Sequence, residues 1–274
     1  MSKSIEKYMP YLCDLIVRAG KSTLDYYQQN NLLITKKMDM SPLTQADLSA
    51  NKIITDGLIA RNAAIPVISE ENKIIDFSKR KNWKRFWLID PLDGTKEFIK
   101  GSDEFTVNIA LIENNEPALG VVYAPAKKML YFGSKNSGAY YQKDNHAAQK
   151  LITCNTTSTL KIGVSASHLD LKTDAFAQKI GIVFNKPVQK ISCGSSLKIC
   201  LLASGEIDVY PRFGPTSEWD TAAAHAILKC TGGELYKTEQ CSPLIYNKCS
   251  LLNPSFIGVS CNFNLDSMQQ LLVL

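Results

Sequence analysis

The sequence lacks several features that would assign it to a class of protein at once. Its first residues carry no continuous apolar segment of roughly 7 to 15 residues, as a secretion signal does, and no later stretch approaches about 18 consecutive apolar residues. We therefore expect a cytoplasmic protein without a membrane span. The eight cysteines include no CxxC pair. Reduced cysteines in the core fit this scatter better than a disulfide framework or a structural zinc site.

The charge of the chain is almost balanced. Thirty-one Lys and Arg stand against 26 Asp and Glu, which gives a net charge of +5. This excess favours small anions over cations, and it is too small and too dispersed to indicate a nucleic-acid partner. Hydrophobic residues make up 45% and charged residues 21% of the chain, which indicates a folded globular protein and excludes a disordered, collagen-like or coiled-coil chain.

The first half of the chain combines helical and strand patterns. Apolar side chains at helical spacing predict one long helix over residues 5–29, and the spacing of Thr44 and Asp47 predicts the start of a second helix. The segments IPVIS and KRFWLID have the composition of strands. Four further apolar segments separated by turn residues predict an antiparallel meander. These segments cover residues 105–112, 118–124, 128–133 and 138–142.

The second half alternates strands with helices, and polar residues over 142–159 mark the boundary before it. We expect strands near 161–167, 188–192, 207–212 and 256–260, and helices near 170–180, 195–204, 218–231 and 264–273. The fold class is therefore α/β, a layered α+β sandwich. It comprises an N-terminal subdomain, 1–150, with an antiparallel-rich sheet, and a C-terminal subdomain, 151–274, with a helix-covered second sheet.

One acidic motif, IDPLDGT, has the composition of a metal and phosphate site. Asp90 and Asp93 flank a proline turn at the end of a strand, so both carboxylates can converge on one point. Magnesium prefers oxygen ligands, and these carboxylates with the Leu92 carbonyl suit it. Gly94 lets the backbone approach a ligand, and the amides of Gly94 and Thr95 could donate to a phosphate oxygen. The alternative is an ordinary surface turn.

Two further acidic positions lie at the ends of expected elements. Glu70 and Glu71 follow the strand IPVIS, and Trp219 and Asp220 open a later helix. Asp220 alone could be a plain helix cap. Three acidic strand or helix ends in one chain nevertheless indicate a shared site for a metal ion.

Together these motifs resemble a known family. SEE at 69–71, DPLDGTKEF at 90–98 and WDTAA at 219–223, in this order, resemble the inositol monophosphatase superfamily of metal-dependent, lithium-sensitive phosphatases. Within it the chain is most similar to the 3'(2'),5'-bisphosphate nucleotidase branch, the CysQ type. Three segments carry that likeness: KMDMSPLTQAD at 37–47, EFTVNIALI at 104–112 and YPRFGPTSEWDTAA at 210–223. The resemblance covers nearly the whole chain and implies the layered sugar-phosphatase fold.

The resemblance implies a role for each acidic residue of the motifs. Glu70, Asp90 and the Leu92 carbonyl would hold one Mg²⁺ ion. Asp90 would bridge to a second ion, which Asp93 and Asp220 would also hold, and Glu70 would lie near a possible third. The implied cofactor is therefore two or three Mg²⁺ ions.

Asp47 and Thr95 resemble the pair that hydrogen-bonds the attacking water in this superfamily. Independently of the family, metal coordination lowers the pKa of a bound water, and two ions can stabilise the attacking and departing oxygens of a phosphoryl transfer. Metal-activated water therefore needs no covalent phosphoenzyme. Together with the bridging Asp90, this pair makes up the implied catalytic set.

Specificity is expected from the second half of the chain. Ser195 and Lys198 lie three residues apart at an expected helix start, Arg212 follows a strand, and one hydroxyl with two cations suits a second phosphate. The resemblance implies a substrate-binding set on the phosphate, ribose and nucleotide sides: Gly94, Thr95, His168, Ser195, Ser196, Lys198, Arg212 and Asp220. The alternative is that Lys198 and Arg212 are solvated surface charges and that His168 is a loop residue.

The expected activity is hydrolysis of the 3'-phosphate of adenosine 3',5'-bisphosphate to AMP and phosphate, a step of sulfur metabolism, with 3'-phosphoadenylyl sulfate as a second substrate. Phe213 and Gly214 stand where inositol-specific relatives carry a carboxylate, and Phe213 could lie against a purine. Two alternatives stay open. One is an inositol or sugar monophosphatase on the same metal site. The other is a non-catalytic regulator that binds RNA or a protein through the run KRKNWKR at 79–85, which is otherwise a solvated loop.

Overall fold

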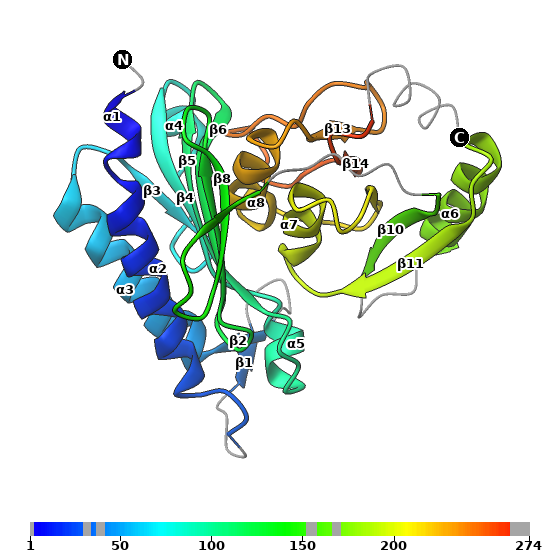
Figure 1. Cartoon of the computed structure of the whole chain (residues 1–274). Coiled ribbons are helices and arrows are strands. Elements are labelled where there is room, and N and C mark those ends of the chain that lie inside the picture. The colour runs from blue at the N-terminus through cyan, green and yellow to red at the C-terminus, as the bar shows by residue number, and fades with distance from the viewer. Residues whose placement is uncertain (1–2, 30–33, 37–41, 152–157, 166–170, 264–274) are drawn as a thin grey trace.

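In the described part of the chain, two large β-sheets alternate with layers of helices, and a third sheet consists of two short strands (Figure 1). The computed structural model describes residues 3–29, 34–36, 42–151, 158–165 and 171–263. This arrangement confirms the predicted α/β layered fold. Among the described residues, no helix is both long and apolar enough to cross a membrane. The seven described cysteines are free thiols.

The larger sheet contains seven strands, which lie in their order along the chain. They are β3 (Val67–Ser69), β4 (Arg85–Asp93), β5 (Thr106–Glu113), β6 (Glu116–Ala124), β7 (Met129–Ser134), β8 (Gly138–Lys143) and β9 (Gln149–Lys150). β3 runs parallel to β4, and all the other neighbours are antiparallel. The predicted meander is confirmed.

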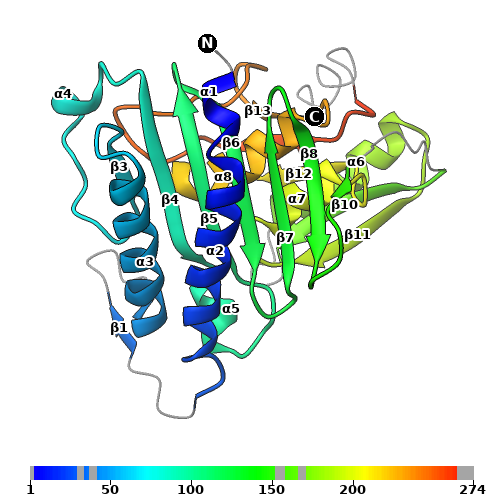
Figure 2. The same cartoon turned by 60° about the vertical axis from the view of Figure 1, so that its left-hand side comes forward.

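Two helices cover the outer face of this sheet (Figure 2). They are α2 (Met9–Leu24) and α3 (Gln45–Arg61), and the short α1 (Lys3–Glu6) precedes them. The prediction of a single helix over 5–29 is wrong, because the helix breaks before Met9 and ends at Leu24. Pro10 has no N–H to donate to a preceding turn, so a helix can begin there but not continue through. The predicted helix start at Thr44 is confirmed.

Four short elements that precede β5 were not predicted, and neither were β9 and the later strand over 234–237. The four are β1 (Ile34–Lys36) and β2 (Pro42–Thr44), which pair antiparallel, and the helices α4 (Phe77–Arg80) and α5 (Thr95–Ile99). None of the four exceeds five residues, so none carries a full period of a sequence pattern. Two of them lie next to residues expected to be functional. β2 leads into α3, which carries Asp47, and α5 follows the acidic motif of β4.

The smaller sheet has five strands in the order β11-β10-β12-β14-β13. Their bounds are β10 (Leu160–Ser165), β11 (Val188–Cys193), β12 (Val209–Arg212), β13 (Glu234–Lys237) and β14 (Phe256–Val259). β10 is parallel to β11 and β12, and the remaining pairs are antiparallel. α6 (Leu171–Val183) packs on β10 and β11. The helix expected over 264–273 lies outside the described residues.

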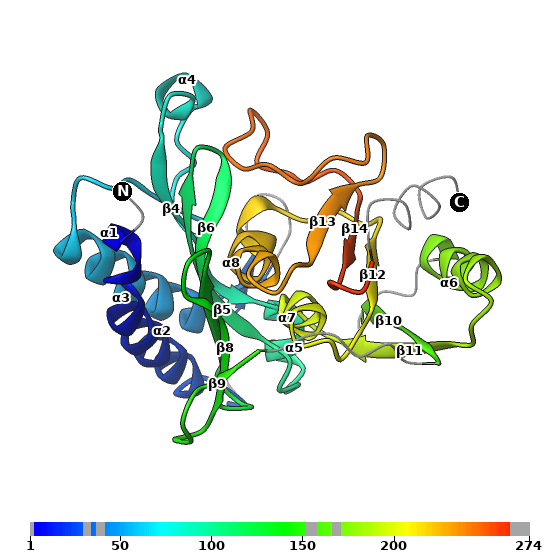
Figure 3. The ribbon, with the colours of Figure 1, turned by 45° about the horizontal axis from the view of Figure 1, so that its top comes forward.

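Two helices fill the space between the sheets (Figure 3). They are α7 (Leu197–Ala203) and α8 (Glu218–Lys229). α8 lies on β5 and β6. The helix approaches β6 closely because β6 has a glycine, Gly120, at the point of contact. A Cβ on Gly120 would lie 2.0 Å from the carbonyl oxygen of Ala223 in α8. At Gly120 the backbone of α8 therefore packs directly against the sheet.

The chain changes from the larger to the smaller sheet between Lys150 and Leu160. This change lies at the polar segment expected to be a boundary. α7 and α8 come from the second half and also pack with residues of the larger sheet in one core cluster. The division into subdomains 1–150 and 151–274 stays a prediction.

Candidate active site

Three carboxylates from separate elements converge at one edge of the larger sheet. Glu70 follows β3 directly, and Asp90 lies on the parallel neighbour β4, so both reach the same edge. The Glu70 N–H donates to the carbonyl of Ile89 (3.3 Å), which holds the two segments side by side. Asp220, in the first turn of α8, is the third. One carboxylate oxygen from each of these acids lies within 4.8 Å of the other two.

A break in the ladder at the acidic motif directs Asp93 to the second half of the chain. The pairing of β4 with β5 shifts register between Asp90 and Asp93. The Leu92 N–H donates to Asp90 Oδ1 (3.0 Å), which fixes the turn. The Ser196 N–H donates to Asp93 Oδ2 (2.6 Å), so this carboxylate also orders the segment before α7. The sequence pattern did not reveal that contact.

The acids of this cluster repel one another and are largely removed from water. Burial raises the pKa of Asp90 well above its usual value, and the charges of Glu70, Asp93 and Asp220 raise it further. Burial likewise raises the pKa of Asp220, and Asp93 and Glu70 add to the shift. It also raises the pKa of Asp93 to about 6, although the Lys198 charge and the Ser196 N–H oppose the change.

This environment fits a divalent cation. Asp90 Oδ2 is buried and accepts no hydrogen bond from the described residues, and a buried carboxylate oxygen without a partner is unfavourable. All the ligands that converge here are oxygens, which Mg²⁺ prefers. A cation among Glu70, Asp90 and Asp220 would replace their mutual repulsion by attraction.

The predicted water-orienting pair is brought together. Asp47, buried in the first turn of α3, accepts a long hydrogen bond from Thr95 Oγ1 on its Oδ1 atom (3.4 Å). Thr95 Oγ1 also lies 3.2 Å from the Leu92 carbonyl oxygen. Gly94 adopts a left-handed conformation, with φ of 89°, directly before α5, and its lack of a side chain makes that conformation accessible.

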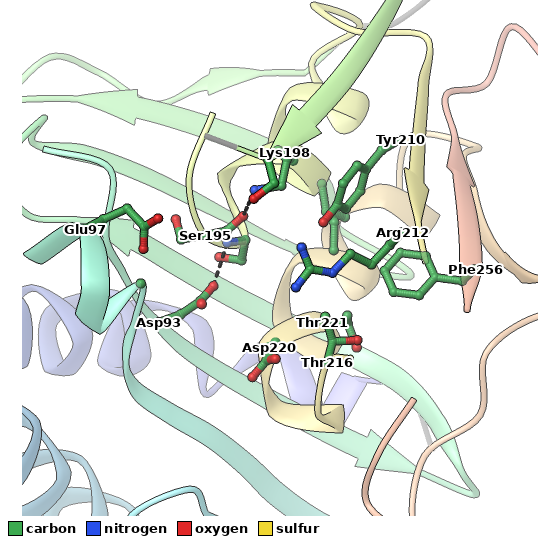
Figure 4. A pocket seen from close by; sticks show the side chains of 14 residues that line it. Asp93, Glu97, Ser195, Lys198, Tyr210, Arg212, Thr216, Asp220, Thr221 and Phe256 are labelled. Carbon is green, nitrogen blue, oxygen red and sulfur yellow. Dashed lines mark hydrogen bonds between the residues drawn. The ribbon is translucent and has the colours of Figure 1, made fainter. Parts of the chain in front are cut away.

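The expected phosphate-binding residues lie beside the acids, where Asp93, Asp220, Ser195, Lys198 and Arg212 line a cavity of about 110 Å³ (Figure 4). The solvated alternative for Lys198 is wrong, because its side chain is buried and donates to the carbonyls of Cys193 (2.7 Å) and Ser195 (3.0 Å). Arg212 donates to the carbonyl of Pro215 (3.1 Å), and its Nε atom is buried without a partner among the described residues. Arg212 can therefore bind an anion directly.

The two serines of this segment play different structural parts. The prediction that Ser195 lies on a helix face is wrong, because α7 begins at Leu197 and Ser195 adopts a positive φ of 49°. Ser195 Oγ is buried and has no partner among the described residues. Ser196 Oγ donates to Asn108 Oδ1 (2.7 Å), which holds this residue against β5. His168 lies outside the described residues.

A second, larger cavity adjoins the first. It measures about 720 Å³ and shares Ser165, Tyr210 and Arg212 with the smaller one. Phe213 and Lys96 also line it. Phe213 forms an edge-on contact with Phe176, with ring centroids 6.1 Å apart, so it also packs against the core of the smaller sheet. Lys96 was not among the residues expected from the sequence, although it follows Thr95 in the acidic motif.

The basic run at 79–85 does not form one continuous charged surface. Lys79, Lys81 and Lys84 are exposed. Arg80 is buried, and Arg85 forms an ion pair with Glu113. The solvated reading therefore holds for three of its five basic side chains.

The layered fold and the acid cluster define a metal-dependent phosphatase of the layered α/β class. The sequence profile of the inositol monophosphatase family matches residues 5–266, and the chain belongs to this family. A 3'(2'),5'-bisphosphate nucleotidase, CysQ, from Shigella flexneri is 41% identical to it over 247 residues, which are 89% of this chain and 96% of the relative.

Solved structures agree with this assignment. CysQ from Bacteroides thetaiotaomicron, a bacterial member of the same family, superposes with a TM-score of 0.79 at 40% identity, covering 90% of this chain and 95% of its own. An IMPase from Thermotoga maritima gives a TM-score of 0.77 at 21% identity, covering 97% and 98% of the two chains. The second likeness shows a shared fold.

Proposed function

We propose that this protein is a 3'(2'),5'-bisphosphate nucleotidase that hydrolyses the 3'-phosphate of adenosine 3',5'-bisphosphate to AMP and phosphate, and that it also accepts 3'-phosphoadenylyl sulfate. The convergence of Glu70, Asp90 and Asp220 on one point carries the phosphatase part of the proposal. Relatives about 40% identical over most of the chain, which bear the name of this nucleotidase, carry the substrate part.

Two or three Mg²⁺ ions are the proposed cofactor. Glu70, Asp90 and the Leu92 carbonyl would hold one ion, and Asp90, Asp93 and Asp220 a second, with Glu70 near a possible third. Bound Mg²⁺ supplies positive charge that stabilises developing negative charge on the phosphate oxygens and favours hydroxide over water. The raised pKa values of Asp90 and Asp220 support the assignment, because a bound cation would replace the repulsion between neighbouring carboxylates by attraction.

The chain's own residues would orient the attacking water. Thr95 Oγ1 directs its proton to Asp47 Oδ1 or to the Leu92 carbonyl, so its lone pairs are available to accept a proton of the water. Asp47 is held in place by the backbone N–H of Thr44 (2.8 Å). This pair would therefore fix the direction of attack on the phosphorus.

The cavities favour a nucleotide over an inositol phosphate. The larger cavity, about 720 Å³, has a volume in the usual range for small-molecule sites. Arg212 lines both this cavity and the smaller one beside the acids. Arg212 would therefore bind the 5'-phosphate, while the buried Lys198 would act by holding the backbone around Ser195. Phe213, which replaces a carboxylate suited to sugar hydroxyls, would lie against the adenine.

Phosphate release tests this proposal directly. The purified protein with Mg²⁺ should release phosphate from adenosine 3',5'-bisphosphate much faster than from inositol monophosphate or fructose bisphosphate. Asp90→Asn should abolish turnover at saturating Mg²⁺ while the protein stays folded. Asp174→Asn is the matched control, because Asp174 is an exposed acid paired with Lys190. A preference for inositol monophosphate would overturn the substrate assignment, and an active Asp90→Asn variant would overturn the metal site.

A further inference from the structure

A buried carboxylate, Glu218, lies two residues before Asp220 and takes no part in the proposed chemistry. Its side chain is fully buried. Oε2 accepts the Asn247 N–H (2.7 Å), and Oε1 accepts the Lys248 N–H (2.9 Å) and the Lys248 Nζ (2.6 Å). The Glu218 N–H donates to the Leu251 carbonyl (2.8 Å). The first residue of α8 is therefore tied through side chain and backbone to the segment 247–251.

Arg80 ties the same segment to the first half of the chain. Its side chain is 1% exposed. Nη1 donates to Asn247 Oδ1 (2.8 Å) and to the Lys248 carbonyl (2.7 Å), and Nη2 donates to the Cys249 carbonyl (2.9 Å). In return Asn247 Nδ2 donates to the Arg80 carbonyl (2.8 Å). A continuous set of hydrogen bonds thus joins the stretch that follows Glu70 to the start of α8.

A third residue closes the network around the first turn of α8. Asn253 Nδ2 donates to the Ser217 carbonyl (2.8 Å) and to Thr221 Oγ1 (3.1 Å). Lys248 Nζ donates to Asn253 Oδ1 (3.2 Å). The residues on either side of Asp220 are therefore held by the same loop that holds Glu218.

We propose that Glu218 is a positioning residue, which with its partners Arg80 and Lys248 holds Asp220 at the distance from Glu70 and Asp90 that a divalent cation requires. Like charges so close together would push the start of α8 away from the sheet, and a hydrogen-bonded anchor on the neighbouring turn opposes that movement. The proposal rests on the proposed function, because it takes Asp220 as a ligand of the ion.

Glu218→Gln tests this role. The amide keeps the shape of the side chain but sets an NH₂ group against an N–H donor, so the anchor loses a hydrogen bond and its charge. We expect Mg²⁺ affinity, measured by isothermal titration calorimetry, to fall roughly 10- to 100-fold, the range seen when groups that orient metal ligands are removed. The melting temperature without metal should also fall, and the increase in it on addition of Mg²⁺ should shrink.

Asp208→Asn is the matched control. Asp208 is a buried acid that accepts the backbone N–H of Lys161 (2.8 Å) immediately before β12, whose other end carries Arg212. This variant should lower the melting temperature without metal and leave Mg²⁺ affinity unchanged. A merely structural role for Glu218 would give the same result as this control.

Lys248→Met gives a second test, because it leaves both backbone hydrogen bonds to Glu218 in place. If Glu218→Gln does not fold, Lys248→Met decides, with a smaller loss of Mg²⁺ affinity expected. Unchanged Mg²⁺ affinity in the folded variant would overturn the positioning role while leaving the nucleotidase proposal intact. A wild-type protein that binds no Mg²⁺ would instead overturn the metal site, and the positioning role with it.

Discussion

The helices α3 and α8 begin with the same local arrangement and meet different surroundings. In each, an aspartate at the third helical position accepts the backbone N–H of the residue three before it, from Thr44 to Asp47 (2.8 Å) and from Ser217 to Asp220 (2.9 Å). One oxygen of each carboxylate is thus occupied by the cap. At α3 the rest of the carboxylate meets the hydroxyl of Thr95. At α8 it meets other carboxylates. A helix cap can thus fix the position of an acid, while the residues around that acid determine its chemistry.

The two aspartates should differ most in their effect on the turnover number, kcat. Asp47→Asn should reduce kcat by about 10²- to 10⁴-fold, the usual range for loss of a group that handles a proton, while Mg²⁺ affinity stays near that of the wild type. Steady-state kinetics and calorimetric titration measure the two quantities. A loss of Mg²⁺ affinity with little change in kcat would contradict the assignment of Asp47 to turnover and of Asp220 to metal binding.

Asp220→Asn should affect Mg²⁺ affinity directly, in contrast to Asp47→Asn, which should affect kcat. We expect Mg²⁺ affinity to fall by about 10- to 100-fold or more, because the amide keeps an oxygen but loses the charge that attracts the ion. Activity should recover in part as the Mg²⁺ concentration is raised. A loss of activity that does not depend on Mg²⁺ concentration would contradict the role of ligand.

The acid cluster should also make stability depend on pH in a way that Mg²⁺ reverses. The pKa of Asp93 is raised to about 6, and those of Asp90 and Asp220 are raised well above the usual value. A raised carboxyl pKa stabilises the fold at low pH, and this contribution is lost as the pH rises from about 4 through the folded-state pKa. The increase in melting temperature caused by Mg²⁺, relative to EDTA, should therefore be larger at pH 7 than at pH 5. Equal increases would contradict this coupling.

The smallest expected effect concerns the cap of α3. Thr44 Oγ1 accepts the Ala46 N–H (3.2 Å) and donates to Asp47 Oδ2 (2.5 Å). Thr44→Ala should lower the free energy of unfolding by about 1 kcal/mol, as is typical for loss of a helix N-cap. Urea denaturation measures this change. A variant as stable as the wild type would indicate that Asp47 is held by the backbone alone.

The sequence predicted features that depend on neighbouring residues and missed those that depend on folding. The Thr44 cap and the meander are local patterns, and both are confirmed. The meeting of Glu70 with Asp220 joins distant parts of the chain, so spacing alone could suggest it but only the family resemblance made it specific. The burial of Lys198 and Arg80 was missed because a charged residue gives no sequence signal of the carbonyls that will surround it. The role of His168 stays a prediction.

The glycine on β6 beneath α8 has a mechanical consequence for the proposed site. Where a helix rests on a sheet through side chains, repacking can change their separation gradually. At Gly120 the neighbour is the carbonyl of Ala223, which has no rotamer to change. The spacing between α8 and β6 is thus limited by a hard backbone contact close to the turn that bears Asp220. The backbone contact at Gly120 therefore fixes how far the Asp220 carboxylate reaches into the acid cluster. A substitution at residue 120 could change that distance only by displacing the whole of α8.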